Sequence, residues 1–415
     1  MSRVLAVHRY YWPDTPPYAS MLRTIAAEWT RAGHTVDVLT SQPSYKPEAN
    51  IAKRPATERV DDVRVRRIAM EADRSASWRR PFNVIWFPLV VAWRILIGPR
   101  YDVVMCSTAP PVSLGWAVSL AARVRGARFV YHCMDLHPEI GRLSGEFSRP
   151  LVYRVMHRLE LMTCRRAAAI VVLSEDMRDA VIARDPALAP RIVTLTNFEL
   201  PDFDTAGAVA SPLPVDGTRM RIVFTGNVGR FQNLDVITRA VLAPEPELDA
   251  LELVFMGEGA AKAELKSLVA QAPADVRDRV RFLDHGSPAA VRALLATADL
   301  GLVSLTPEVI KFAYPSKTAT YLGAGLPVLV AVETDSSLVR LVEETRIGGH
   351  LPVDDPRETA RVLASWVSRR AELAAMSGRA ATVWQEEFAS DRLLPRWARL
   401  LEEVAHPDDV HEASR

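Results

Sequence analysis

The chain has 415 residues, of which 49% are hydrophobic and 24% are charged, and this size and composition favour a well-packed protein of two domains. Its formal net charge of +1 excludes a global field that would attract nucleic acid, so we expect no nucleic-acid partner. The three cysteines, Cys106, Cys133 and Cys164, lack metal-ligand spacing and fit a reducing compartment.

The first half of the chain alternates strand-length runs rich in Val and Ile with segments of helical period. This alternation is typical of a parallel sheet with crossover helices. The strands are expected at residues 4–7, 36–40, 63–68, 103–106, 129–132 and 169–173. Because the chain opens on a strand and not on the apolar region of a signal peptide, we expect a cytoplasmic protein.

Aromatic and basic side chains interleave with aliphatic ones from Trp78 to Arg100. The apolar part is short and contains Pro88 and Arg94, so a membrane-spanning helix is not expected. This composition favours a helix at a bilayer interface, and a buried crossover helix is the alternative. The residues expected to dock are Trp78, Arg79, Arg80, Trp86, Phe87, Trp93 and Arg94.

Residues 131–139 form a loop after the strand 129–132 and contain four ionisable side chains. Loops that follow parallel strands are where acid–base groups gather in α/β folds. Asp135 is the first candidate for catalysis and His132 the second, although a hydrogen-bonded core histidine is an equal alternative. For His137 and Glu139, a place in a surface loop is the alternative to a role in the site.

A turn-rich stretch at residues 197–218 separates the two halves, and the strand pattern restarts at 221–225, 251–256, 280–283, 300–304 and 327–330. We therefore expect domains at 1–205 and 206–384, a C-terminal helix at 385–405 and a frayed tail at 406–415. Asp202 and Asp204 have the spacing of a metal-binding pair. Because they lie in the linker and not at a strand end, we expect no metal site.

Two glycine-rich turns follow strands of the second domain. In the first, Gly226, Asn227 and Gly229 would let backbone N–H groups approach a diphosphate, and Arg230 would add a forked charge. In the second, Gly257 and Gly259 are candidates for contact with a nucleotide base, with close packing as the favoured alternative. For the turn at residues 226–229, the alternative is a tight βα turn that needs glycine for its backbone alone.

Residues 314–330 predict a short helix that feeds a buried strand. Pro315 suits a helix start, Ser316 can cap the helix, and Lys317 places a positive charge in its first turn. Gly325 is expected to end the helix. The segment therefore predicts an anion site in which Ser316 and Lys317 would bind a diphosphate, and an ordinary helix with a solvated lysine is the alternative.

These elements resemble the two-domain B-type nucleotide-sugar glycosyltransferases, and among them the fourth family of retaining enzymes. The resemblance covers nearly the whole chain and rests on the order of the motifs Tyr10-Tyr11-Trp12-Pro13, Tyr101-Asp102-Val103-Val104, Val172-Leu173-Ser174-Glu175, Thr225-Gly226-Asn227-Val228-Gly229, Met256-Gly257-Glu258-Gly259, Ala298-Asp299-Leu300-Gly301 and Pro315-Ser316-Lys317. It implies an α/β fold with two doubly wound Rossmann-like domains facing across a cleft. The C-terminal helix would return to the N-terminal domain.

The resemblance implies a hexosyltransferase that moves a sugar from a nucleotide-diphosphate donor to a glycan, without a metal or other cofactor. The setting would be bacterial cell-surface polysaccharide biosynthesis, as in the colanic-acid-like enzymes. The acceptor would be linked to polyprenyl diphosphate at the inner face of the cell membrane. Asp135 or His132 would orient the attacking hydroxyl, and His137 and Glu139 would lie on the acceptor side.

The chain departs from the family at several positions. Relatives carry two glutamates eight positions apart, and here Phe312 and Thr320 stand in their places. Glu308 is a candidate replacement for the first, and Glu308 and Thr320 are the expected contacts to the nucleotide or sugar. A basic pair near the first glycine turn is also missing, so Arg230 and Lys317 would have to supply the charge. A nucleotide-sugar 2-epimerase and a non-catalytic nucleotide-sugar-binding or membrane-scaffold protein remain as alternatives.

Overall fold

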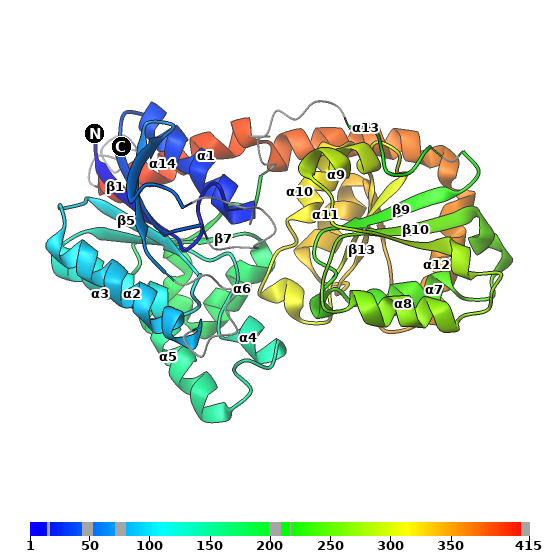
Figure 1. The fold of residues 1–415 in the computed structure, drawn as a ribbon, viewed down its shortest axis with the longest axis horizontal. Helices are drawn as coiled ribbons and strands as arrows, with labels where there is room; N and C mark the ends of the chain where they lie inside the picture. The colour runs from blue at the N-terminus through cyan, green and yellow to red at the C-terminus, as the bar shows by residue number, and fades with distance from the viewer. Residues whose placement is uncertain (15–16, 44–52, 71–79, 199–208, 216, 408–415) are drawn as a thin grey trace. The chain divides into compact units, whose positions relative to one another are not determined.

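The computed structural model describes residues 1–14, 17–43, 53–70, 80–198, 209–215 and 217–407. The chain divides into two compact units, the first built mainly from Met1–Pro201 and the second from Asp202–Lys311 (Figure 1). Phe312–Tyr314 and Ser390–Arg415 return to the first unit, whereas Pro315–Ala389 belongs to the second. Trp78, Arg79, Asp202 and Asp204 lie outside the described residues.

The described part of the first unit holds an eight-stranded sheet in the order β3-β4-β2-β1-β5-β6-β7-β8. Only the β3–β4 pair is antiparallel. The strands are β1 (Arg3–Val7), β2 (Thr35–Ser41), β3 (Thr57–Val60), β4 (Val63–Ile68), β5 (Val103–Ser107), β6 (Arg128–His132), β7 (Ala169–Val172) and β8 (Ile192–Thr194). Their alternate side chains enter separate core clusters on the two faces of the sheet.

Helices cover both faces of this sheet. They are α1 (Pro17–Arg31), α2 (Arg80–Ile97), α3 (Ser113–Arg125), α4 (Glu139–Leu143), α5 (Pro150–Arg166), α6 (Glu175–Arg184) and α14 (Ser390–Ala405). Side chains of α1 and α14 join one core cluster, and side chains of α2 and α3 join the other. The Trp29 indole N–H donates to the Trp397 carbonyl at 3.1 Å, so the predicted return of the C-terminal helix to the N-terminal domain is confirmed.

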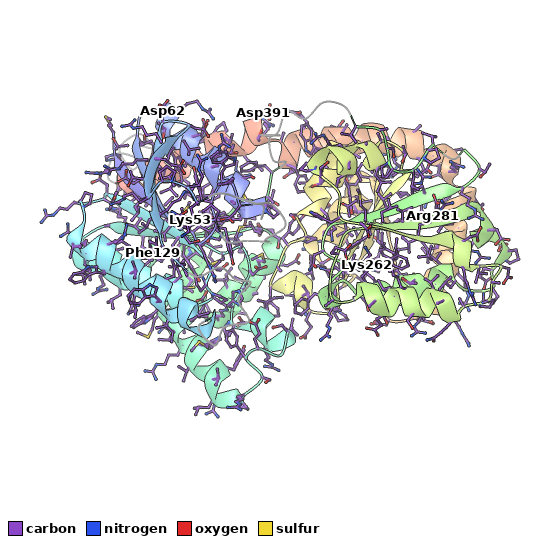
Figure 2. The ribbon with its side chains drawn as sticks, viewed as in Figure 1. Lys53, Asp62, Phe129, Lys262, Arg281 and Asp391 are labelled. Carbon is purple, nitrogen blue, oxygen red and sulfur yellow. The ribbon has the colours of Figure 1, made fainter. Side chains whose placement is uncertain are left out.

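The second unit holds a parallel sheet in the order β11-β10-β9-β12-β13-β14. Its strands are β9 (Met220–Thr225), β10 (Leu251–Met256), β11 (Val280–Leu283), β12 (Leu300–Ser304), β13 (Val328–Ala331) and β14 (Gly348–His350). Its helices are α7 (Leu234–Val241), α8 (Lys262–Gln271), α9 (Pro288–Leu295), α10 (Lys317–Gly323), α11 (Ser337–Thr345), α12 (Pro356–Ser368) and α13 (Leu373–Val383). Side chains fill both units (Figure 2). The predicted α/β fold of two doubly wound sheets is confirmed.

Two details differ from the sequence prediction. Strands β3, β8 and β14 were not predicted, because each has at most four residues and lies at a sheet edge, where a strand carries little apolar pattern. The last helix begins at Ser390 and not at 385, because a π-helical turn at Trp384–Phe388 continues α13 and Ala389 is extended.

Candidate functional site

The first glycine turn of the second unit follows β9, whose six residues are all buried. Gly226 has a φ of 105°, which favours glycine, and its N–H donates to the Met256 carbonyl at 2.9 Å. The Gly229 N–H donates to the Gln232 side chain at 2.7 Å. These two amides are therefore used within the protein, which leaves the exposed side chains of Asn227 and Arg230 as the groups that face solvent.

The second glycine turn packs directly on the first. A Cβ on Gly257 would lie 1.8 Å from the Gly226 carbonyl oxygen, and a Cβ on Gly259 would lie 2.2 Å from the Val228 carbonyl oxygen. Lys262, labelled in Figure 2, donates to Glu258 at 2.6 Å and to the Leu283 carbonyl at 3.0 Å. Close packing therefore explains these glycines, and a contact with a nucleotide stays a prediction.

We expect Gly257→Ala to lower the free energy of unfolding of the second unit by about 2–5 kcal/mol, because the added methyl group meets the Gly226 carbonyl and the φ of 151° is strained for alanine. Chemical denaturation followed by circular dichroism measures this change. The matched control is Gly378→Ala in α13, where a Cβ would meet nothing within 4 Å. That variant should be more stable by about 0.5–1 kcal/mol, and equal losses in both variants would contradict the packing argument.

Lys317 opens helix α10, and its ammonium nitrogen lies 3.7 Å from the centroid of the Phe224 ring at the end of β9. Burial lowers the pKa of Lys317 to about 7. The Tyr321 hydroxyl, one turn further along α10, accepts the Thr225 N–H at 2.8 Å and so ties the helix to β9. The lysine thus stands, poorly solvated, at the strand end that carries the first glycine turn.

The neighbouring predictions are modified by the structure. Ser316 is exposed and its side chain makes no capping hydrogen bond, because its own backbone is already helical, so the prediction of a Ser316 cap is wrong. Gly325 follows the helix with a φ of 71°, and its expected role in ending the helix is confirmed. Thr320 is half-buried on α10.

Glu308 is exposed and has a φ of 70°, which is strained for a residue with a side chain. Its N–H donates to the carboxylate of Glu333, which follows β13, and the second oxygen of Glu333 is buried without a hydrogen-bond partner. Sequence reasoning missed Glu333. The sequence feature that could have revealed Glu333 is its position two residues after a buried strand, at the same sheet edge as the glycine turns.

In the first unit, His132 is fully buried at the end of β6. One ring nitrogen lies 3.0 Å from the Tyr18 hydroxyl, and the Trp397 ring centroid is 4.7 Å from the imidazole centroid. Burial lowers the pKa of His132 to about 3. The imidazole is neutral and has no exposed surface, which favours the alternative of a hydrogen-bonded core histidine, and a catalytic role for His132 stays a prediction.

Sequence reasoning also missed His8, which follows β1 at the same sheet edge and shares a hydrogen bond with Ser107. Burial, together with the nearby His132 and Arg9, lowers the pKa of His8 to about 3. Its ring lies edge-on to Tyr18, with 4.3 Å between centroids. The sequence feature that could have revealed His8 is its position directly after the first strand.

Asp135 lies three residues beyond β6 and pairs as an isolated antiparallel bridge with Ala313. The adjacent Leu136 N–H donates to the Phe312 carbonyl at 2.7 Å, so a segment from the second half of the chain holds this loop. Burial raises the pKa of the Asp135 carboxyl to about 6. Among the described residues its carboxylate has no hydrogen-bond or ion-pair partner, which leaves it available for a ligand.

His137 and Glu139 are both held by Arg184, the last residue of α6. The arginine donates to the His137 carbonyl at 3.0 Å and to both carboxylate oxygens of Glu139. Burial, and then the Arg184 charge, lowers the pKa of His137 to about 4. The structure therefore gives these residues a shared structural role, and an acceptor contact stays a prediction. Arg184 is 45 residues from Glu139, and sequence reasoning did not connect them.

The predicted membrane-docking residues of helix α2 do not all lie on its exposed face. Phe87 is fully buried in the core of the first unit, so its place among the docking residues is wrong; composition alone did not show which face of the helix packs inward. Trp86 and Trp93 are 44% and 61% exposed, and Arg94 is half-buried. Arg80 is the first residue of the helix. Within the described ranges, no helix is long and apolar enough to cross a bilayer.

Residues 18–197 match the glycosyl transferase 4-like domain family. The Pseudomonas aeruginosa protein named "Probable glycosyltransferase WbjE" is 27% identical over 308 residues, which cover 72% of this chain and 74% of WbjE. WcaI of Escherichia coli strain K12, by name a colanic acid biosynthesis glycosyl transferase, is 23% identical over 344 residues, covering 76% and 80%. The chain is a homologue of these glycosyltransferases. The resemblance predicted from the motifs is confirmed.

Solved structures agree on the fold. Sucrose-phosphate synthase of Thermosynechococcus elongatus superposes with a TM-score of 0.70 at 14% identity and covers 97% of this chain and 99% of its own. HepE of Anabaena, in complex with UDP and glucose, gives a TM-score of 0.66 at 14% identity and covers 97% and 100%. The fold of this glycosyltransferase homologue is thus that of the B-type glycosyltransferases.

Proposed function

We propose that this glycosyltransferase homologue is a retaining enzyme that transfers a sugar from a nucleoside-diphosphate donor to a glycan in bacterial cell-surface polysaccharide biosynthesis. The observation that carries the proposal is the poorly solvated ammonium of Lys317 over Phe224, at the strand end that bears the first glycine turn. The names of its relatives, WbjE and WcaI, support the same class.

The donor diphosphate would bind beside Lys317, with Asn227 and Arg230 as further contacts. In the reaction, the bond between the sugar C1 and the β-phosphate oxygen breaks, and the acceptor hydroxyl oxygen forms a bond to C1 on the same face. The hydroxyl proton passes to the departing diphosphate. A positive charge at the leaving oxygens stabilises the charge that develops there, which is the main catalytic device we assign to this chain.

Asp135 would accept a hydrogen bond from the acceptor hydroxyl or from the sugar. A pKa of about 6 still leaves the Asp135 carboxylate ionised near neutral pH. Because this carboxylate has no hydrogen-bond or ion-pair partner among the described residues, it can accept a hydrogen bond from a substrate hydroxyl, as an orienting group must. No role is assigned to a metal. Among the described residues, no three His, Cys, Asp or Glu side chains are grouped so that they could hold one.

We further propose that the acceptor is lipid-linked and that the first unit docks on an anionic bilayer. The outer face of α2 exposes apolar side chains at Val84, Ile85, Trp86, Leu89, Trp93 and Ile97, each at least 40% exposed. Helix α3 runs beside α2, because the Ser113 hydroxyl donates to the Val84 carbonyl at 3.0 Å and Arg125 donates to the Gly98 carbonyl at 2.9 Å. Exposed tryptophans and nearby arginines suit the headgroup region of an anionic membrane.

Replacing Leu89 and Trp93 together by serine is expected to lower partitioning onto vesicles of phosphatidylglycerol about 10- to 100-fold, because the two side chains lose their buried apolar area in the bilayer. Vesicle co-sedimentation measures the partition coefficient. The control is Val209→Ser with Val215→Ser, two exposed apolar residues of the second unit. Equal partitioning of both double variants would argue against docking through α2.

The function is tested with purified protein, radiolabelled UDP-, GDP- and dTDP-sugars and a bacterial membrane extract, by separating lipid-soluble from aqueous label. Transfer from one donor into the lipid phase, undiminished in EDTA, is the expected result. The anomeric configuration of the product, read by NMR, tests retention. A released and altered sugar would point to an epimerase, and saturable donor binding without product to a binding protein.

A further inference from the structure

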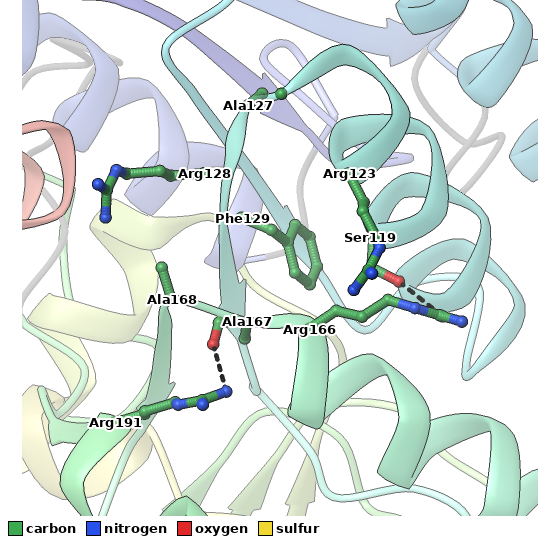
Figure 3. Close-up of a pocket in the computed structure, with 10 residues that line it drawn as sticks. Ser119, Arg123, Ala127, Arg128, Phe129, Arg166, Ala167, Ala168 and Arg191 are labelled. Atoms are coloured by element: carbon green, nitrogen blue, oxygen red, sulfur yellow. Dashed lines mark hydrogen bonds between the residues drawn. The ribbon is translucent and has the colours of Figure 1, made fainter.

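A cavity of about 390 Å³ lies in the first unit, where the strands β6 and β7 begin (Figure 3). This is the amino edge of the sheet, whereas His132 ends β6 and Asp135 follows it at the carboxyl edge. Four arginines line the cavity, together with the Ser119 hydroxyl and the ring of Phe129. The arginines are Arg123, Arg128, Arg166 and Arg191.

Four different elements bring these arginines together. Arg123 lies in the last turn of α3, Arg166 ends α5, Arg128 opens β6, and Arg191 directly precedes β8. In Figure 3 the side chains of Arg123 and Arg166 lie next to each other beside Ser119. The Arg166 guanidinium donates to the Ser119 hydroxyl at 3.4 Å, and Arg191 donates to the Ala167 carbonyl at 3.3 Å.

The positive charge in this cavity is not balanced by acidic residues. No Asp or Glu is among the described residues that line it, and neither Arg123 nor Arg128 forms a hydrogen bond or ion pair with any described side chain. The carbonyl ends of α3 and α5 offset part of the charge of Arg123 and Arg166. Burial, and then the like charge of Arg123, lowers the pKa of Arg166. An anion bound between the two arginines, which line the same cavity, would offset their like charges.

Phosphate is the anion that suits this arrangement best. Guanidinium groups bind phosphate oxygens through paired N–H donors, and a dianionic tetrahedral group offers more charge and more acceptor oxygens to several arginines than a planar carboxylate does. The volume exceeds that of a phosphate alone and falls in the lower part of the range for small-ligand pockets, about 300–1,000 Å³. There is room for an organic substituent on the phosphate.

We propose that this arginine-lined cavity is a phosphate-binding site, separate from the donor region and independent of the proposed function. The phosphate has two possible sources. One is a soluble phosphate or phosphomonoester. The other is the headgroup of an anionic lipid, to which the exposed Leu120 and Val124 of α3, on either side of Arg123 in the sequence, would give access.

The test compares the full-length protein with the double variant Arg123→Gln, Arg166→Gln, using pyrophosphate and inorganic phosphate as probes in calorimetry at low salt. We expect at least a tenfold weaker affinity in the variant. The control is Arg392→Gln with Arg399→Gln, two exposed arginines on α14 of the same unit, which should bind the probes as the wild type does. Thermal melts establish that each variant folds. When Lys317→Ala is already present, the Arg123/Arg166 substitutions should weaken the affinity for the phosphate probes by the same factor, because the two arginines lie outside the donor region.

A second arm uses vesicles of phosphatidylglycerol and of phosphatidylcholine. Loss of phosphatidylglycerol binding in the Arg123/Arg166 variant, with that binding displaced by free phosphate, identifies a lipid headgroup. Unchanged vesicle binding together with weakened phosphate binding identifies a soluble ligand. If the folded variant binds both phosphate probes and vesicles as the wild type and the α14 control do, the proposal is overturned.

Discussion

Replacing Lys317 by alanine is expected to lower kcat/KM for the sugar donor about 10²- to 10³-fold, because the departing diphosphate loses its best-placed positive charge. The ammonium lies over the Phe224 ring at the end of β9, and partial burial makes its charge costly until an anion is bound. The loss should affect chemistry as well as donor binding, because charge on the leaving oxygens increases towards the transition state. Initial rates over a range of donor concentrations measure both effects.

The matched control for this lysine is Lys266→Ala. Lys266 is an exposed lysine of the same unit whose nitrogen lies 5.9 Å from the Phe282 ring centroid, so the substitution removes the same side chain from the same kind of aromatic contact. It should leave kcat/KM within about twofold of the wild type, as a solvated surface charge contributes little. A similar loss in both variants would show that Lys317 acts through stability or general charge and not at the donor.

The pH profile separates a charged lysine from a structural one. In the free enzyme, Lys317 is protonated below its pKa of about 7 and loses its charge as the pH rises through that value. Because kcat/KM reports the free enzyme, it should fall above about pH 7. In Lys317→Arg, the guanidinium remains charged at every accessible pH, so this alkaline decline should disappear. A decline that persists unchanged in the arginine variant belongs to another group.

Replacing Asp135 by asparagine is expected to lower kcat about 10²- to 10³-fold with a smaller change in donor KM, since the carboxylate is assigned to the acceptor hydroxyl. The variant keeps the shape of the side chain, and the backbone bridge to Ala313 does not involve the carboxylate. Burial raises the pKa of Asp135 to about 6, so wild-type activity should fall as the pH drops through 6 and the carboxylate is protonated. The residual activity of the variant should lack this acid limb.

The control for Asp135 is Asp179→Asn on α6, an exposed aspartate of the same unit. It should retain wild-type kcat and the acid limb. If Asp135→Asn transfers sugar at the wild-type rate, the orienting group lies elsewhere in the first unit. Substitutions in the buried cluster of His8, Tyr18 and His132 would then test whether this cluster positions a different orienting residue.

The donor region could be predicted in large part because its signals are local. Gly226, Gly257 and Lys317 each stand at a fixed offset from a buried strand or the start of a helix, and such offsets follow from strand and helix geometry. Even here the structure changed the interpretation. The amides of Gly226 and Gly229 donate within the protein, and Gly257 is required by the close approach of the Gly226 carbonyl.

The first unit was harder to interpret because its important contacts join distant parts of the chain. His132 looks like a loop histidine in the sequence, yet Tyr18 and Trp397 enclose it, the latter 265 positions away. Glu139 looks like a solvated carboxylate, yet it pairs with Arg184. The arginines of the phosphate-binding cavity come from four separate elements and share no motif.

The α/β class, the order of most strands, the glycine turns and the family resemblance could all be predicted from the sequence, because period-2 and period-3.6 patterns and turn residues act over a few positions. Which side chains are buried follows from the packing of the whole fold, and burial in turn shifts the pKa values of Lys317, Asp135 and His132. Packing also places Phe87 in the core and the last helix against His132. Burial depends on packing between segments far apart in the chain, which local patterns do not encode.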